Sequence, residues 1–228
     1  MSDNVLVVAA HPDDEILGCG GAVARHASQG DTITSVILAE GATSRADAGQ
    51  DEVDRLKDAA RRAAEVLGAT PPINLGFPDN QLDSLPLLNV IQSIEEIIFD
   101  SRPSVVYVHH GGDLNIDHRI AHEAVITACR PIPGSPVRKI LTYETVSSTE
   151  WSGPAIGPAF RPTTFIDIAG HMETKLAALD AYQTEMRPFP HVRSMEAVTA
   201  LATLRGSQAG LVAAEAFQLE LEISPFET

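Results

Sequence analysis

A histidine and three acidic residues occupy five consecutive positions near the N-terminus, His11-Pro12-Asp13-Asp14-Glu15. In a tight turn, a histidine and an aspartate three residues apart can both reach one metal ion, which makes His11 and Asp14 candidate ligands. Asp13 then lies beside the metal instead of on it. The competing interpretation is a polar turn whose aspartates cap a following helix.

A second group of histidines and acidic residues begins at His109, directly after the apolar run 104–108. Asp117 and His118 open a predicted helix in this group. His122 lies four residues after His118, so one helix face carries both histidines. Spacing alone allows a metal held by His118 or by both histidines. The first alternative leaves an open position for water on a tetrahedral metal, and the second does not.

Both groups follow short apolar segments that are typical of buried strands. Strands are expected at 5–10, 32–38, 73–77, 104–108, 139–145 and 164–168, and helices at 16–29, 52–67, 87–100, 117–128, 171–182 and from 195 onward. This alternation predicts an α/β fold over residues 1–228, a single-domain Rossmann-like three-layer sandwich with a mainly parallel central sheet. The carboxyl ends of its strands would bring the two groups together.

The composition argues against several classes of partner. The formal net charge is −15 at pH 7, which disfavours nucleic acid and an anionic membrane surface. No apolar run approaches the roughly 18 residues of a membrane span, and the N-terminus lacks a basic and apolar leader. Two cysteines, Cys19 and Cys129, are too few for a disulfide framework. We therefore expect a cytoplasmic protein.

The first group, a strand that ends in Ala-His-Pro-Asp-Asp-Glu, resembles the zinc-dependent de-N-acetylases of the PIG-L/LmbE-like family. The second group strengthens the resemblance, because Asn115-Ile116-Asp117-His118 stands where the family has His-Pro-Asp-His. The resemblance implies Zn²⁺ as the cofactor, with His11, Asp14 and His118 as its ligands and Asp13 as the base that takes a proton from water.

The resemblance also implies roles for the rest of the second group. Asp117 would orient a histidine ligand from behind. Asn115, which replaces the family's histidine, could donate an N–H to an oxyanion but carries no titratable proton. Either Asp13 then performs both proton transfers, or His122 supplies the missing imidazole.

The substrate implied by the resemblance is a small N-acetylated amino sugar or its conjugate. Four residues are expected to contact it: Arg55, Asp79, His191 and Arg193. Each also has a plainer interpretation. Arg55 could be an exposed arginine on an acidic helix and Asp79 part of an Asx turn. The segment 187–194 could be a proline-stiffened loop at a subunit contact, so a homo-oligomer is a further possibility.

Other functions compete with amino-sugar deacetylation. A close alternative is an amidase that acts on a thiol–sugar conjugate. A phosphohydrolase of the haloacid dehalogenase type would need Asp-x-Asp and Mg²⁺, whereas Glu15 follows Asp13 by two positions and paired histidines favour zinc. A metal-binding subunit without catalysis is the third alternative.

Overall fold

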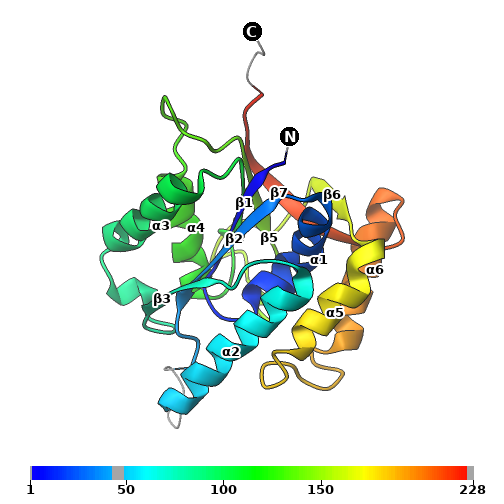
Figure 1. The fold of residues 1–228 in the computed structure, drawn as a ribbon. Helices are drawn as coiled ribbons and strands as arrows, with labels where there is room; N and C mark the ends of the chain where they lie inside the picture. The colour runs from blue at the N-terminus through cyan, green and yellow to red at the C-terminus, as the bar shows by residue number, and fades with distance from the viewer. Residues whose placement is uncertain (1, 43–48, 225–228) are drawn as a thin grey trace.

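The computed structural model describes residues 2–42 and 49–224 (Figure 1). The strands are β1 (Asn4–Ala9), β2 (Thr32–Ala39), β3 (Ile73–Phe77), β4 (Val105–His109), β5 (Lys139–Tyr143), β6 (Thr164–Asp167) and β7 (Ala214–Glu222). The helices are α1 (Asp14–Gln29), α2 (Gln50–Leu67), α3 (Leu87–Ser101), α4 (Ile116–Ala128), α5 (Met172–Asp180) and α6 (Met195–Ala209), with short 3₁₀ turns η1 (Leu82–Ser84), η2 (Thr149–Trp151) and η3 (Ala169–His171). Within the described ranges, every helix is too short or too polar to span a bilayer.

Among the described residues, seven strands form one sheet in the order β3-β2-β1-β4-β5-β7-β6. The pairs among β1 to β5 are parallel, and β7 runs antiparallel to both β5 and β6. The predicted α/β class with a mainly parallel sheet is confirmed. The sequence-based prediction missed β7. The first four residues of this strand are buried and most of the remainder is exposed, so no single alternation of apolar and polar residues spans it.

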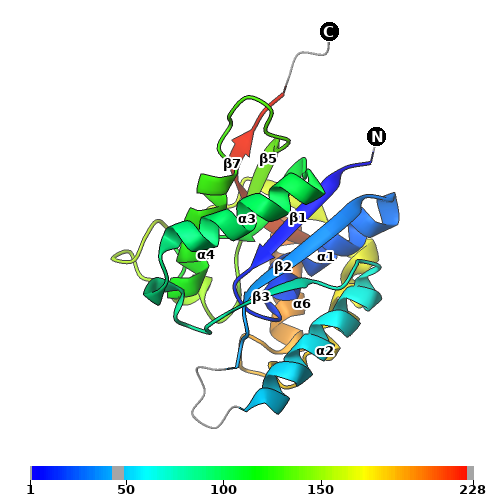
Figure 2. The same cartoon turned by 60° about the vertical axis from the view of Figure 1, so that its left-hand side comes forward.

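Helices cover both faces of the sheet (Figures 1 and 2). α1, α2, α5 and α6 pack on one face, and α3 and α4 pack on the other. β1 shows why both faces are covered, because Val5 and Val7 join the first core while Leu6 and Val8 join the second. Successive side chains of a strand point to opposite faces, and all four of these are almost fully buried.

β1 lies where the strand order reverses. The chain leaves β1 through α1 and returns in β2 on one side, while β4 pairs with β1 on the other side. Val8 is opposite Val108 in the β1–β4 register, so these two strands end at nearly the same level. In open α/β sheets ligands bind at such a switch point, beyond the carboxyl ends of the strands. Both chemically active groups of the sequence follow these two strand ends.

A buried ion pair supports α1 where this helix is interrupted. Cys19 has non-helical backbone angles, φ −144° and ψ 20°. Two successive N–H groups, beginning with that of Gly21, donate to the carboxylate of Glu215 at 2.8 and 2.7 Å. Lys175 Nζ donates to Glu215 Oε1 at 2.6 Å and to the carbonyl of Leu17 at 2.9 Å. Glu215 therefore caps the second half of α1, and Lys175 satisfies the end of the first half.

The glycines near the start of α1 allow close packing against neighbouring side chains. A Cβ on Gly18 would lie 2.2 Å from the ring of Tyr143. The Tyr143 hydroxyl donates to the carbonyl of Val8 at 2.9 Å. Only a glycine at position 18 lets the helix approach the tyrosine that ties β5 to β1.

Lys175→Met should destabilise the fold by about 3–5 kcal/mol, because it leaves the charge of Glu215 buried without its cation. Adding Glu215→Gln removes that charge, so the double variant should be more stable than the sum of the two single losses. Urea unfolding of the four proteins measures this coupling. As a matched control, Lys139→Met breaks the more exposed pair with Glu222 and should cost less than about 1 kcal/mol. Additive losses at Lys175 and Glu215 would contradict the assignment.

Candidate metal centre

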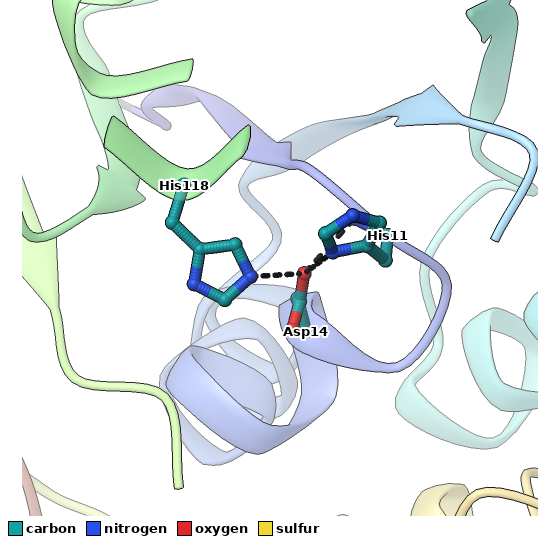
Figure 3. A group of neighbouring side chains, drawn as sticks. All are labelled: His11, Asp14 and His118. Carbon is teal, nitrogen blue, oxygen red and sulfur yellow. Dashed lines mark hydrogen bonds and ion pairs between the residues drawn. The ribbon is translucent and has the colours of Figure 1, made fainter. Parts of the chain in front are cut away.

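Three side chains from the two strand exits converge on one point (Figure 3). His11 and Asp14 come from the turn between β1 and α1, and His118 comes from the first turns of α4. Asp14 Oδ2 lies 3.1 Å from His11 Nδ1 and 3.2 Å from His118 Nε2. One donor atom from each residue lies within 4.8 Å of the other two. The structure thus brings together the three residues that the resemblance implied as ligands.

Each imidazole is held from behind by a further carboxylate. Asp117 Oδ2 lies 3.1 Å from Nε2 of His11, and Asp113 Oδ1 lies 3.1 Å from Nδ1 of His118. Such partners fix the ring orientation and the tautomer of a histidine ligand and raise its basicity. The nitrogens that face Asp14 are therefore the candidate metal donors of these two rings in the convergent set. Asp117 orients His11, while Asp113 was not assigned a role from the sequence.

The electrostatics of the cluster fit a divalent cation. Asp13, Asp14, Asp113 and Asp117 are all at most 1% exposed. Burial opposes the charge of each, yet the nearby imidazoles hold the pKa of Asp14 well below its usual range. Burial lowers the pKa of His11, but hydrogen bonds to Asp117 and Asp14 outweigh it and raise that pKa to about 10. Two imidazoles and one carboxylate are a donor set that suits zinc.

His109 links the two strand exits and was left without a definite role by the sequence. Its Nε2 accepts the N–H of Ala10 at 2.9 Å, which leaves the ring proton on Nδ1, 3.1 Å from Thr145 Oγ1. The ring also stacks on that of His118 with centroids 3.8 Å apart. Burial lowers the pKa of His109, so it stays neutral. This neutral imidazole therefore holds the backbone of Ala10 by a hydrogen bond and the ring of His118 by stacking.

Asp13 is held beside the cluster in an unusual backbone conformation. Its φ of 99° lies in the left-handed region that residues other than glycine seldom adopt. Its N–H donates to Glu15 Oε2 at 3.1 Å, and its Oδ2 accepts from Arg193 at 2.7 Å. Burial raises the pKa of Asp13, and the Arg193 guanidinium opposes that effect. Asp13 thus presents a carboxylate next to the cluster without being one of its three convergent residues.

A family model named PIG-L, with the description GlcNAc-PI de-N-acetylase, matches residues 6–129. This range contains all three convergent residues. The chain belongs to the PIG-L family. The family expected from the two sequence motifs is confirmed, and the haloacid dehalogenase alternative is excluded.

Two curated relatives and one solved structure illustrate the range of the PIG-L fold. The uncharacterized deacetylase YaiS of Escherichia coli (strain K12) is 33% identical over 186 residues, which covers 79% of this chain and 90% of the relative. The 1D-myo-inositol 2-acetamido-2-deoxy-alpha-D-glucopyranoside deacetylase 1 of Saccharopolyspora erythraea is 26% identical over 236 residues, with 80% and 78% covered. GalB of Pseudomonas putida KT2440, the 4-carboxy-2-hydroxymuconate hydratase, superposes with a TM-score of 0.79 at 25% identity and covers 100% of both chains.

Asn115, which stands where the resemblance implied a histidine, has a definite local role in the structure. Its Oδ1 accepts the N–H of Asp117 at 2.8 Å and so caps α4. Its Nδ2 donates to Asn80 Oδ1 at 3.1 Å. His122 faces away from the cluster, because its Nδ1 donates to the carbonyl of His109 at 3.0 Å and its ring packs on Gly111. The geometry does not support His122 as a fourth ligand.

The four predicted substrate contacts are placed differently from one another. Asp79 is buried, with Oδ1 3.4 Å from His11 Nε2. His191 accepts the N–H of Arg193 and contacts the ring of Trp151. Arg193 reaches Asp13. Arg55 is 71% exposed and pairs with Glu52 on α2, so the structure does not bring it to the cluster.

Zn²⁺ binding to the metal-free protein should release at least about one proton per chain, because a histidine with a pKa of about 10 is protonated at pH 7–8 and must lose that proton to bind a metal. The affinity should therefore rise with pH, by about tenfold per unit for each proton released. Calorimetric titration in buffers of different ionisation enthalpy counts the protons.

The matched controls for this titration lie on one helix. His118→Ala should abolish stoichiometric binding, and His122→Ala, one turn further along α4, should leave it intact. Heats of binding that are the same in every buffer, or binding that depends equally on both histidines, would contradict the site.

Proposed function

We propose that the protein is a zinc-dependent hydrolase that removes the acetyl group from an N-acetylated amino sugar or its conjugate. The observation that carries the proposal is the carboxylate of Asp13, held next to the convergent set His11, Asp14 and His118 but not part of it. This arrangement provides a metal site with three protein donors and a separate buried base, as hydrolysis by activated water requires.

The residues divide the chemistry between them. Bound zinc would act as a Lewis acid that polarises the acetamide carbonyl and lowers the pKa of water. Asp13 accepts the proton of the attacking water through its carboxylate, one oxygen of which is already bound by Arg193. The same residue then returns the proton to the nitrogen of the leaving amine. Asp117 and Asp113 hold the imidazoles of His11 and His118 in place throughout.

Asn115 is the proposed second donor to the oxyanion. One N–H of its amide is directed to Asn80, and an amide nitrogen carries two. Because the carbonyl of this side chain caps α4, the amide is held in a fixed orientation at the start of the helix that carries His118. It cannot deliver a proton, so proton return falls to Asp13.

The substrate class is proposed from the relatives. YaiS is described as a deacetylase, and the Saccharopolyspora erythraea relative acts on an acetamido sugar joined to inositol. An N-acetylated hexosamine conjugate is therefore the substrate class that we propose first. A thiol–sugar conjugate presents the same amide and remains within the class.

Hydration of an unsaturated acid is the second candidate function, because GalB matches the entire chain. A carboxylated substrate would need cationic side chains at the cluster. In the part of the chain that the structure describes, Arg193 is the one arginine or lysine ion-paired with Asp13 or Asp14, and its guanidinium serves Asp13. The surrounding carboxylates favour an uncharged acetamide over a dicarboxylate.

Acetate release from a panel of N-acetylated amino sugars and their inositol, malate and nucleotide conjugates tests the proposal. Asp13→Asn should retain zinc and the fold but lose roughly 10²–10⁴ in turnover, the range for a general base. Asp14→Asn should weaken zinc binding itself. Equal loss of metal in the two variants would refute the division of roles. Hydration of a carboxylated enol without acetate release would favour the second candidate.

The two substitutions Asn115→Ser and Asn115→Ala separate the cap from the oxyanion donor. Serine still caps α4 but lacks the amide, so it should lose about 10–10³ in turnover at nearly normal stability. Alanine should lose similar turnover and about 1 kcal/mol of stability. Turnover is measured by acetate release and stability by urea unfolding. His122→Ala should leave the alkaline limb of the pH–rate profile in place; loss of that limb with zinc still bound would make His122 the proton donor.

A further inference from the structure

Arg193 was expected from the sequence to contact the substrate. We propose instead that Arg193 is a positioning residue, whose guanidinium fixes the carboxylate of Asp13 for proton transfer. This inference rests on the proposed function, in which Asp13 is the general base.

The guanidinium of Arg193 bridges two elements at the edge of the cluster. Its Nη1 lies 2.7 Å from Asp13 Oδ2, and its Nε donates to Ser147 Oγ at 2.6 Å. Glu185 Oε2 lies 3.9 Å from the same Nη1. The side chain is 22% exposed, so these contacts form in a largely desolvated setting. An ion pair of this kind is directional and stronger than one at the surface.

The segment that carries Arg193 is itself fixed at several points. Arg193 N–H donates to His191 Nδ1 at 3.0 Å, and the carbonyl of Arg193 accepts the N–H of Arg187 at 3.3 Å. The next residue, Ser194, caps α6 by accepting the N–H of Ala197 at 3.1 Å. The guanidinium is thus anchored from the backbone, as a group must be if it is to hold another side chain in place.

Asp13 needs such a partner because of its backbone. A residue other than glycine in the left-handed region costs on the order of 1–3 kcal/mol and persists only where its surroundings hold it there. Glu15 binds the N–H of Asp13, and Arg193 binds its carboxylate, so both ends of the residue are held. The Asp13 side chain is thus held at a strained turn beside the three convergent residues, and its contact with Arg193 sets the orientation of the carboxylate.

An arginine suits this position better than a lysine. The guanidinium offers donors in a rigid fork, and here two of its nitrogens reach Asp13 and Ser147 at once. A lysine ammonium is a single point on a flexible stem and has no donor at the place of Nε. Arg193→Lys should therefore keep the charge but lose the fixed orientation.

A double-mutant cycle between Arg193→Met and Asp13→Asn tests the inference, with acetate release from the best substrate of the panel as the assay. If Arg193 acts through Asp13, Arg193→Met alone should lower kcat by about 10²-fold with KM nearly unchanged, which is the cost of a slightly misplaced group. In the Asp13→Asn background the same change should cost less than about threefold. Arg193→Lys should recover only part of the loss.

The matched control is Arg187→Met, which removes an arginine of the same segment whose guanidinium donates to main-chain carbonyls. It should leave kcat and the coupling unaffected. If Arg193→Met instead raises KM at constant kcat, or costs as much without Asp13 as with it, Arg193 is a substrate contact and the inference is wrong.

A measurement without turnover separates this inference from the proposed function. In protein with isotope-labelled arginine guanidinium groups, Arg193 should give a nuclear magnetic resonance signal of slow side-chain rotation that Asp13→Asn abolishes. If Asp13→Asn leaves turnover intact while this signal is lost, the proposed base is wrong but the Arg193–Asp13 contact exists. A signal indifferent to Asp13→Asn overturns the inference itself.

Discussion

The placement of the candidate metal centre depends on the hydrogen bonds and the ion pair that the buried carboxylate of Glu215 makes with α1 and Lys175. This carboxylate lies inside the core and accepts hydrogen bonds from two N–H groups of α1 and from the ammonium of Lys175. A buried backbone N–H without a partner costs about 1–3 kcal/mol, so an interruption of α1 without this cap would be costly. With the cap, the first turn of α1 can present Asp14 at the end of β1. The second half of the helix packs separately, with Gly21 against Ile168.

The donors of the cluster are ordered by the protein before any metal is bound. Sheet pairing fixes the ends of β1 and β4 relative to each other. The hydrogen bond from the N–H of Ala10 to His109 Nε2 links the two strand ends a second time. Asp117 and Asp113 then set the two ligand rings from outside. Each contact restricts a side-chain torsion of a candidate ligand that metal binding would otherwise have to order. A rigid scaffold gives a precise site in this way.

The three convergent residues could be predicted from the sequence because each lies in a short motif after a predicted strand, and the resemblance of both motifs to one family singled them out. His11 and Asp14 lie three residues apart, and His118 follows the next strand in the middle of the sheet. Motifs of this kind can be recognised in the amino-acid sequence alone. The partners from distant segments were not predictable in this way: Lys175 and Glu215 meet across 40 residues, and Arg193 meets Asp13 across 180. Nothing in the spacing of Arg193 distinguishes a substrate contact from a partner of Asp13.

The order of these residues along the chain has a consequence for how the family can diversify. The PIG-L model ends at residue 129 and already includes every ligand of the candidate centre. Ser147 and Arg193 lie beyond that range, as do the exposed rings of Trp151 and Phe189. The first half of the chain therefore encodes the convergent residues of the candidate metal centre, and the second half adds the contact that Arg193 makes with the Asp13 carboxylate beside it. Evolution could exchange the later segments to change the reaction or its substrate while the first half keeps its fold and its convergent residues, which offers a physical reason why deacetylases and a hydratase share one scaffold.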